Sequence, residues 1–226
     1  ATVVVSGISY LSYLLKRYVF HESGVLVSGI IGGLYSSTAT ISVLARKSRK
    51  ASEQEANEYV AAMLLAVSMM FLRFMILILI FSREIFTSIY PYLLIMSVVA
   101  AVVAWFIHSR HRRSKDMTDE SEDEDSSNPL EFKVALIFAT LFVVFTVLTH
   151  YTLVYAGTGG LNLLSFVSGL SDITPFILNL LQNTGSVAVL VVVACSMQAI
   201  ISNILVNMFY ALFFAGKGSK LRPWIL

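Results

Sequence analysis

Apolar residues follow one another in long runs along this chain, and short charged or glycine-containing breaks separate the runs. Several runs exceed the roughly 18 to 20 residues that a helix needs to cross the hydrocarbon core of a bilayer. Helix is the expected state, because these runs lack the roughly ten-residue alternation of a membrane barrel. The seven predicted segments are about 2–20, 25–44, 59–81, 85–107, 134–155, 161–181 and 186–214.

Composition supports a polytopic membrane protein of the all-α class with about seven transmembrane segments. Of the 226 residues, 57% are hydrophobic and 13% are charged, with a mean hydropathy of +0.77, so the chain lacks the polar surface of a soluble domain. A net charge of +2 gives no reason to expect a nucleic-acid partner. The single cysteine, Cys195, excludes an intrachain disulfide, and packing between helices is its expected role.

One break, residues 110–129, has the composition of a linker, with four basic residues followed by seven acidic ones. It is predicted to be a disordered connector, and a metal-binding tail is the alternative. The predicted division is residues 1–108 for a first repeat with a connecting helix, 109–128 for the linker and 129–226 for a second repeat. The positive-inside rule favours the side that holds the basic groups at 46–50 and 110–115 as cytoplasmic.

Two pairs of stretches indicate an internal repeat. They are GGLYSSTATISVLA (32–45) with SGLSDITPFILNLL (168–181), and AVSMM (66–70) with ACSMQ (194–198). Segments one to three and five to seven are therefore predicted to be two copies of one three-helix unit, as in many transporters, with chance resemblance between apolar helices as the alternative. The copies would be parallel if all seven segments cross, and inverted if the second and sixth are re-entrant.

The sixth segment carries Asp172 and Pro175 near its middle. Ser171 or Asp172 is suited to cap a helix whose first turn holds Pro175, where the missing amide hydrogen costs nothing. The second and sixth helices are therefore predicted to be interrupted. An interrupted helix at membrane depth is tolerated only when it is buried in protein or lines a cavity.

Hydroxyl groups cluster in the second segment, where Ser36, Ser37 and Thr38 follow a glycine pair. They either pack helices closely or replace the hydration shell of an ion. Asn203 in the seventh segment has a similar pair of roles, because intramembrane amides hold helices together or coordinate a dehydrated ion.

Arg73 is the other charged group well inside a predicted span. An intramembrane charge costs about 2.5 to 3.5 kcal/mol on insertion scales, so such groups pair or face a polar cavity. Three interpretations are open: a structural ion pair with Asp172, a pair that tunes an ion path, and snorkelling of Arg73 to the interface.

Five strings together resemble the C-terminal membrane module of unknown function found in MgtC/SapB-type bacterial membrane proteins, over residues 8–217. The strings are SGIIGGLYSSTATISVLARKSR, AVSMMFLRFMILILI, NPLEFKVALIFATLF, SFVSGLSDITPFILNLL and ISNILVNMFYALFFAGK. The resemblance implies a multi-pass protein of the bacterial inner (plasma) membrane, a preceding MgtC-like region and a loose link to magnesium or cation homeostasis. The family-pattern positions are Ser36, Ser37, Thr38, Arg73, Asp172 and Asn203. One departure is Thr174, which stands where the family pattern often has a second acid, so a two-carboxylate divalent site is less secure.

The expected function is transport or channelling of a small ion, most of all a cation or proton. Asp172 would be the charged ligand and Arg73 the counter-charge, and a resident metal is left undetermined. The predicted pore or ion-binding groups are Asp172, Thr174, Ser36, Ser37, Thr38 and Asn203. The rival is a non-transporting scaffold or regulatory subunit. No enzyme signature and no cofactor are expected, and the expected partners are the lipid bilayer, a small ion and, as an open option, a second copy of the chain.

Overall fold

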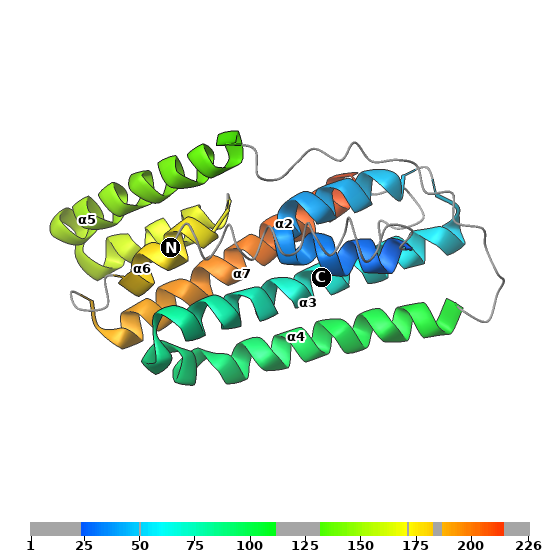
Figure 1. The fold of residues 1–226 in the computed structure, drawn as a ribbon, viewed down its shortest axis with the longest axis horizontal. Helices are drawn as coiled ribbons and strands as arrows, with labels where there is room; N and C mark the ends of the chain where they lie inside the picture. Colours follow the sequence, from blue (N-terminus) through cyan, green and yellow to red (C-terminus); the bar gives the residue numbers. More distant parts are fainter. Residues whose placement is uncertain (1–23, 50, 112–131, 171, 183–186, 215–226) are drawn as a thin grey trace.

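The computed structural model describes residues 24–49, 51–111, 132–170, 172–182 and 187–214, all of them in helices or short connections. The first predicted segment, nearly all of the charged linker, Ser171 and the basic tail lie outside the described residues. Six helices are described: α2 (Val25–Lys47), α3 (Glu53–Phe81), α4 (Arg83–His111), α5 (Phe132–Ser168), α6 (Thr174–Gln182) and α7 (Val189–Phe214). They form an elongated bundle (Figure 1), so the all-helical prediction is confirmed.

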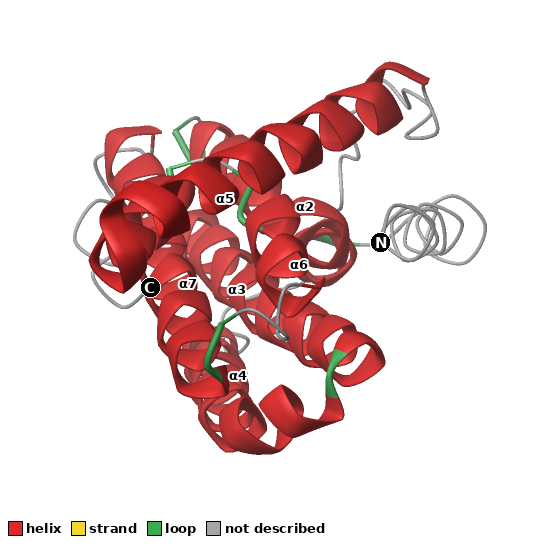
Figure 2. Ribbon diagram, turned by 90° about the vertical axis from the view of Figure 1, so that its left-hand side faces the viewer, coloured by secondary structure: helices red, strands yellow, loops and turns green. Residues whose placement is uncertain are grey.

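Helix α3 is the centre of the bundle, with α2, α4, α6 and α7 around it (Figure 2). A capping box fixes its start, since Ser52 and Glu55 each accept a hydrogen bond from the other's backbone amide. Its buried face is mostly apolar, with Phe71 and Leu77 among its members, and it also holds Ser68 and Arg73. A hydrogen bond of 2.9 Å between the hydroxyls of Ser68 and Ser97 joins it to α4.

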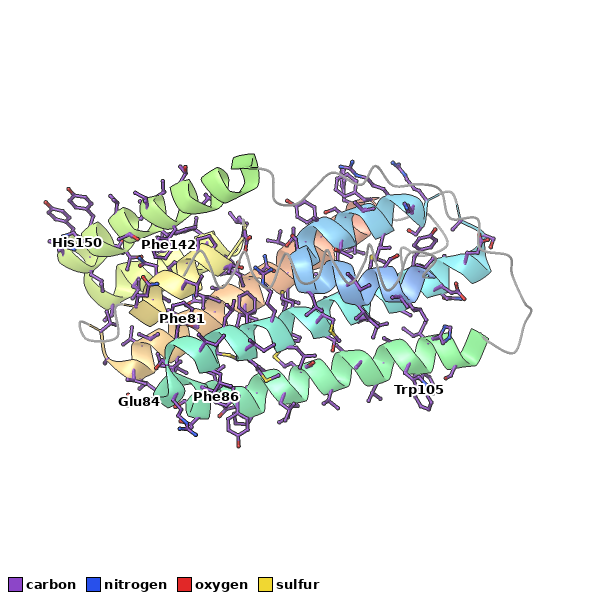
Figure 3. All side chains as sticks on the ribbon, in the orientation of Figure 1. Phe81, Glu84, Phe86, Trp105, Phe142 and His150 are labelled. Atoms are coloured by element: carbon purple, nitrogen blue, oxygen red, sulfur yellow. The ribbon has the colours of Figure 1, made fainter. Side chains whose placement is uncertain are left out.

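By length and composition, four described helices could cross a membrane: Glu55–Phe81, Arg83–Ser109, Thr140–Ser168 and Val189–Phe214. The third of these is interrupted at Gly157 and is not one straight rod. Large apolar side chains cover their outer faces, and Trp105, at 69% exposure, points away from the bundle (Figure 3). A continuous apolar exterior of this kind suits lipid rather than water. The chain therefore has the character of a membrane protein, and the count of seven spans stays a prediction.

Helix α2 is a hairpin of two arms. Ser36 leaves the helical conformation at φ −156° and ψ 104°, and the chain then runs back beside itself (Figure 1). Gly32 lies directly against the side chain of Thr40, a residue that would be about 12 Å away along a straight helix. The predicted interruption of the second segment is thus confirmed at Ser36.

The second hairpin consists of the last part of α5, residues 158–168, and α6, and its tip lies between them. It begins after Gly157, where the backbone adopts φ 58° and ψ −151° and the chain reverses, so that Gly160 lies against Thr152. The first arm ends at Ser168, and α6 begins at Thr174 and runs back toward the end of the bundle from which that arm came (Figure 1). The predicted interruption of the sixth segment is confirmed here. The broad break expected at residues 156–160 is instead a single residue, because one glycine suffices to reverse the backbone.

We expect Gly157→Ala to lower the free energy of unfolding by about 1 to 3 kcal/mol, because its φ and ψ belong to a region that only glycine occupies without strain. Gly159→Ala is the matched control. It has open space around its Cβ position and no positive φ, so its stability should be unchanged or slightly raised. SDS titration of both purified variants measures the difference, and equal stabilities would contradict the strained reversal.

Candidate functional site

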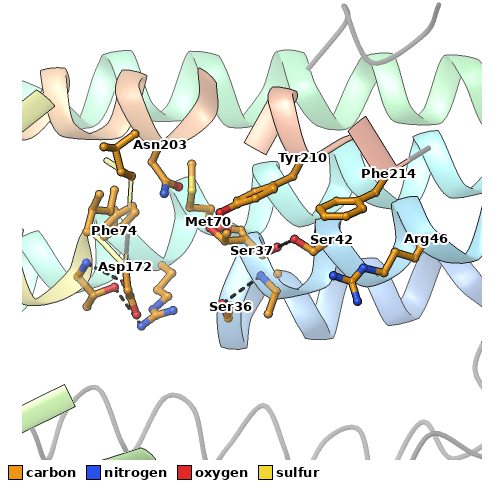
Figure 4. Close-up of a pocket in the computed structure, with 17 residues that line it drawn as sticks. Ser36, Ser37, Ser42, Arg46, Met70, Phe74, Asp172, Asn203, Tyr210 and Phe214 are labelled. Atoms are coloured by element: carbon orange, nitrogen blue, oxygen red, sulfur yellow. Dashed lines mark hydrogen bonds between the residues drawn. The ribbon is translucent and has the colours of Figure 1, made fainter. Parts of the chain in front are cut away.

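The tips of the two hairpins meet at a pocket of about 470 Å³ between α2, α3, α6 and α7. The hairpins approach it from opposite ends of the bundle (Figure 1). In Figure 4, Asp172 lies at one end of the pocket and Arg46 at the other, with Ser36, Ser37 and Ser42 between them. The pocket brings together all seven residues singled out in the sequence: Ser36, Ser37, Thr38, Arg73, Asp172, Thr174 and Asn203.

The tip of α2 supplies the hydroxyl wall of the pocket. Ser36 caps the second arm, because its Oγ accepts a hydrogen bond from the Ala39 amide at 3.4 Å. Ser37 is buried and Thr38 is half-buried. Ser42 returns a hydrogen bond of 2.8 Å to the Thr38 carbonyl. Ser36 and Ser42 therefore form hydrogen bonds with the backbone of their own hairpin, as expected for packing. Ser37 and Thr38 also line the pocket.

The tip of the second hairpin supplies the acidic group. Asp172 Oδ1 accepts a hydrogen bond of 2.9 Å from the Thr174 amide, and the Ile177 amide bonds to the Ile173 carbonyl to begin α6. The carboxylate of Asp172 therefore lies at the N-terminal, electropositive end of α6. Pro175 occupies the first turn as predicted. The side chain of Asp172 is exposed toward the pocket rather than enclosed.

Arg73 reaches the same tip from α3. It is only 6% exposed, and its Nη2 donates a hydrogen bond of 3.3 Å to the Thr174 hydroxyl. Thr174 therefore lies between the guanidinium group and the carboxylate of Asp172. Arg73 and Asp172 are thus linked through Thr174, whose hydroxyl accepts from Arg73 and whose amide donates to Asp172. The burial of Arg73 also disagrees with snorkelling to the interface.

Helix α7 donates side-chain hydrogen bonds to two carbonyls at the break of the second hairpin, one of which, that of Phe166, also accepts from the Gly169 amide. The Ser202 hydroxyl donates to the Phe166 carbonyl at 2.7 Å, and Asn203 Nδ2 donates to the Gly169 carbonyl at 3.2 Å. Asn203 Oδ1 in turn accepts from Asn207 at 3.2 Å. These contacts agree with the helix-joining role of the amide, although Asn203 also lines the pocket. Its contact with an ion stays a prediction.

We expect Ser202→Ala to lower the free energy of unfolding by about 0.6 to 1.7 kcal/mol, the range for hydrogen bonds between membrane helices. The Phe166 carbonyl would lose the donor that now lies 2.7 Å away. Ser109→Ala is the control, because that hydroxyl bonds only one turn back within α4. Thermal melting in detergent compares the two variants, and a Ser202→Ala protein as stable as the control would show that this bond does not hold the hairpin.

The sequence did not single out the other end of the pocket, formed by Arg46, Tyr210 and Phe214. The Arg46 guanidinium lies over the Phe214 ring at 4.6 Å from its centroid, and Phe214 stacks on Tyr210 at 6.1 Å (Figure 4). Arg46 had been counted only among the basic residues that flank spans. The one-turn spacing of the two aromatic residues was the available signal, but it is equally typical of a lipid-facing helix.

Within the described ranges, no group of three or more histidine, cysteine, aspartate or glutamate side chains is arranged to hold a metal ion. The pocket offers one carboxylate, several hydroxyls and two guanidinium groups. An ion here would thus meet mostly neutral oxygen donors and would keep part of its hydration shell.

Comparison with known proteins identifies relatives without an assigned activity. The family described as Domain of unknown function (DUF4010) matches residues 3–215. An uncharacterized protein of Aquifex aeolicus (strain VF5) is 27% identical over 200 residues, which cover 87% of this chain and 85% of the relative. No solved structure matches the chain.

Proposed function

The chain belongs to the DUF4010 family, a domain of unknown function, so its role has to be inferred from the pocket, and we propose that it is a membrane transporter or channel for a small ion. The observation that carries the proposal is the polar pocket of about 470 Å³ formed where two interrupted helices meet. Interrupted helices that face each other within an apolar bundle are how many transporters build their binding sites.

The cost of polarity in lipid supports this proposal. Charged side chains inside a bilayer are expensive and usually mark substrate or ion paths. The chain nevertheless places Asp172, Arg73 and a cluster of hydroxyls around one space inside an apolar bundle.

The proposed roles follow from the positions of the groups. Asp172 would bind a cation or proton, because it is the acidic group among the described lining residues. The hydroxyls of Ser36, Ser37, Thr38 and Thr174 would replace water around the ion, with Asn203 beside them. Arg73 would balance the charge of Asp172 through Thr174 when the ion leaves.

The finer points of topology belong to the same proposal. Hairpins that enter from opposite ends suit two inverted copies of one unit, one within residues 1–108 and one within 129–226. A multi-pass place in a bacterial inner membrane fits the apolar exterior. An association with MgtC/SapB-type proteins and cation homeostasis is proposed from the sequence resemblance alone. A further MgtC-like region in a longer chain and a homo-oligomer complete this proposal.

A non-transporting scaffold is the second candidate, and the bonds from Ser202 and Asn203 to the broken hairpin favour it. In a scaffold, the polar groups would only lock helices. The two functions differ in whether water and ions reach Asp172.

Reconstitution into liposomes tests the proposal. The purified protein should carry ions across the vesicle wall in a screen of protons, monovalent and divalent cations, and anions. Flux above protein-free vesicles for at least one ion supports transport. If the folded protein moves none of them, the scaffold function is correct.

A further inference from the structure

The charges around the pocket are not balanced. Its described lining residues include two guanidinium groups, Arg46 and Arg73, and one carboxylate, Asp172, which leaves one net positive charge. Both arginines stay charged at any physiological pH. A single monovalent anion would bring the described lining to neutrality while Asp172 is ionised.

The broken backbone adds to this positive character. The N-terminal ends of the second arm of α2 and of α6 both face the pocket, through Ser37, Thr38 and Thr174. At the opposite, C-terminal end of the first arm of the second hairpin, the Phe166 and Gly169 carbonyls accept hydrogen bonds from Ser202 and Asn203. Helix N-termini carry partial positive charge, and that charge favours anions.

We infer that the pocket binds a small oxyanion between Arg73 and Arg46. This inference rests on the proposed function and adds a second substrate class to it, because a cation or proton at Asp172 would then be accompanied by an anion. Guanidinium groups match the oxygens of carboxylates and phosphates, and the hydroxyls of Ser36 and Ser37 line the same pocket as further polar groups. A volume of about 470 Å³ admits such an anion with several waters, since each water occupies about 30 Å³.

Inorganic phosphate is the probe, and binding to the purified full chain is measured by isothermal titration in detergent. We expect saturable binding that weakens roughly 10-fold or more in Arg73→Lys, which keeps the charge but loses the planar fork, and in Arg46→Gln. Arg83→Gln is the control, because Arg83 is exposed at the start of α4 and does not line the pocket. Arg46 is exposed as well, so its variant stays informative if the Arg73 variant does not fold.

A lipid headgroup shares the chemistry of free phosphate, so a short-chain phosphatidic acid is titrated in parallel. Binding of the lipid without binding of inorganic phosphate would overturn the assignment to a free oxyanion. No phosphate binding, or equal binding by wild type and both pocket variants, would also overturn it. Cation flux without phosphate binding would contradict this inference and leave the proposed function standing. Phosphate binding without flux of any ion would contradict the proposed function and leave phosphate binding by the pocket standing.

Discussion

Asp172→Asn is expected to abolish ion flux, or to uncouple it from its driving ion, while the protein stays folded. Asparagine keeps an oxygen that accepts the 2.9 Å hydrogen bond from the Thr174 amide, so the start of α6 should survive. The substitution removes the negative charge of the pocket. Loss of an interaction with a charged group is worth about 1.5 to 3 kcal/mol, so flux should fall roughly 10- to 150-fold.

The measurement is the initial rate of uptake into liposomes with matched protein content. Glu84→Gln is the matched control, because it removes the same charge from an exposed position outside the pocket, in the first turn of α4 (Figure 3). Its flux should equal that of the wild type. If Asp172→Asn and the wild type had equal flux, Asp172 would not be part of the ion path.

Gly33→Val is expected to lower the free energy of unfolding by about 3 kcal/mol and to close the pocket. A Cβ atom at this position would collide with the backbone of Ala66 in α3, which cannot rotate away. Gly29 meets Ala62 in the same way one turn earlier, so the first arm of α2 and α3 approach along two pairs of small residues. Overpacking costs typically 1 to 3 kcal/mol and sometimes more, and a rigid neighbour places this site at the upper end of about that range.

Thermal melting and the liposome assay together test this prediction. Gly159→Val adds the same side chain where nothing lies within 4 Å, so it should melt as the wild type does. Because Gly33 also lines the pocket, loss of flux should accompany the lower melting temperature. A Gly33→Val protein with wild-type stability would show that α2 is free to move away from α3.

Hydropathy predicted most of the helical bundle, because apolar runs in this chain have little choice but helix. The two interruptions were also predictable. Asp172 and Pro175 disfavour a continuous sixth helix, and in the second helix the Ser36 side chain itself caps the arm that follows the break. The break between the fifth and sixth segments was predictable from the glycine-containing stretch at 156–160, but the residue at which the chain reverses was not. A glycine in an apolar run is equally typical of close helix packing, and only its φ distinguishes the two cases.

The candidate site was predictable in its members but not in their contacts. Charge and hydroxyl content pointed to Asp172, Arg73 and Thr174, yet the chain order does not say which pairs touch. The hydroxyl between Arg73 and Asp172 depends on how α3 meets the second hairpin, which is a property of packing. Arg46 and Phe214 were missed for the same reason, because their contact joins the ends of two helices far apart in the sequence.

The shortness of α6 has an electrical consequence. Its nine residues rise about 14 Å, less than half of a hydrocarbon core about 30 Å thick. Asp172, at the inner end of that helix, would then stand close to the bilayer midplane. A unit charge that travelled from either aqueous side to the carboxylate would traverse about half of the membrane voltage, or about half of the roughly 2.3 kcal/mol that 100 mV supplies across the whole bilayer. Occupancy of the pocket would accordingly respond to membrane potential as well as to concentration.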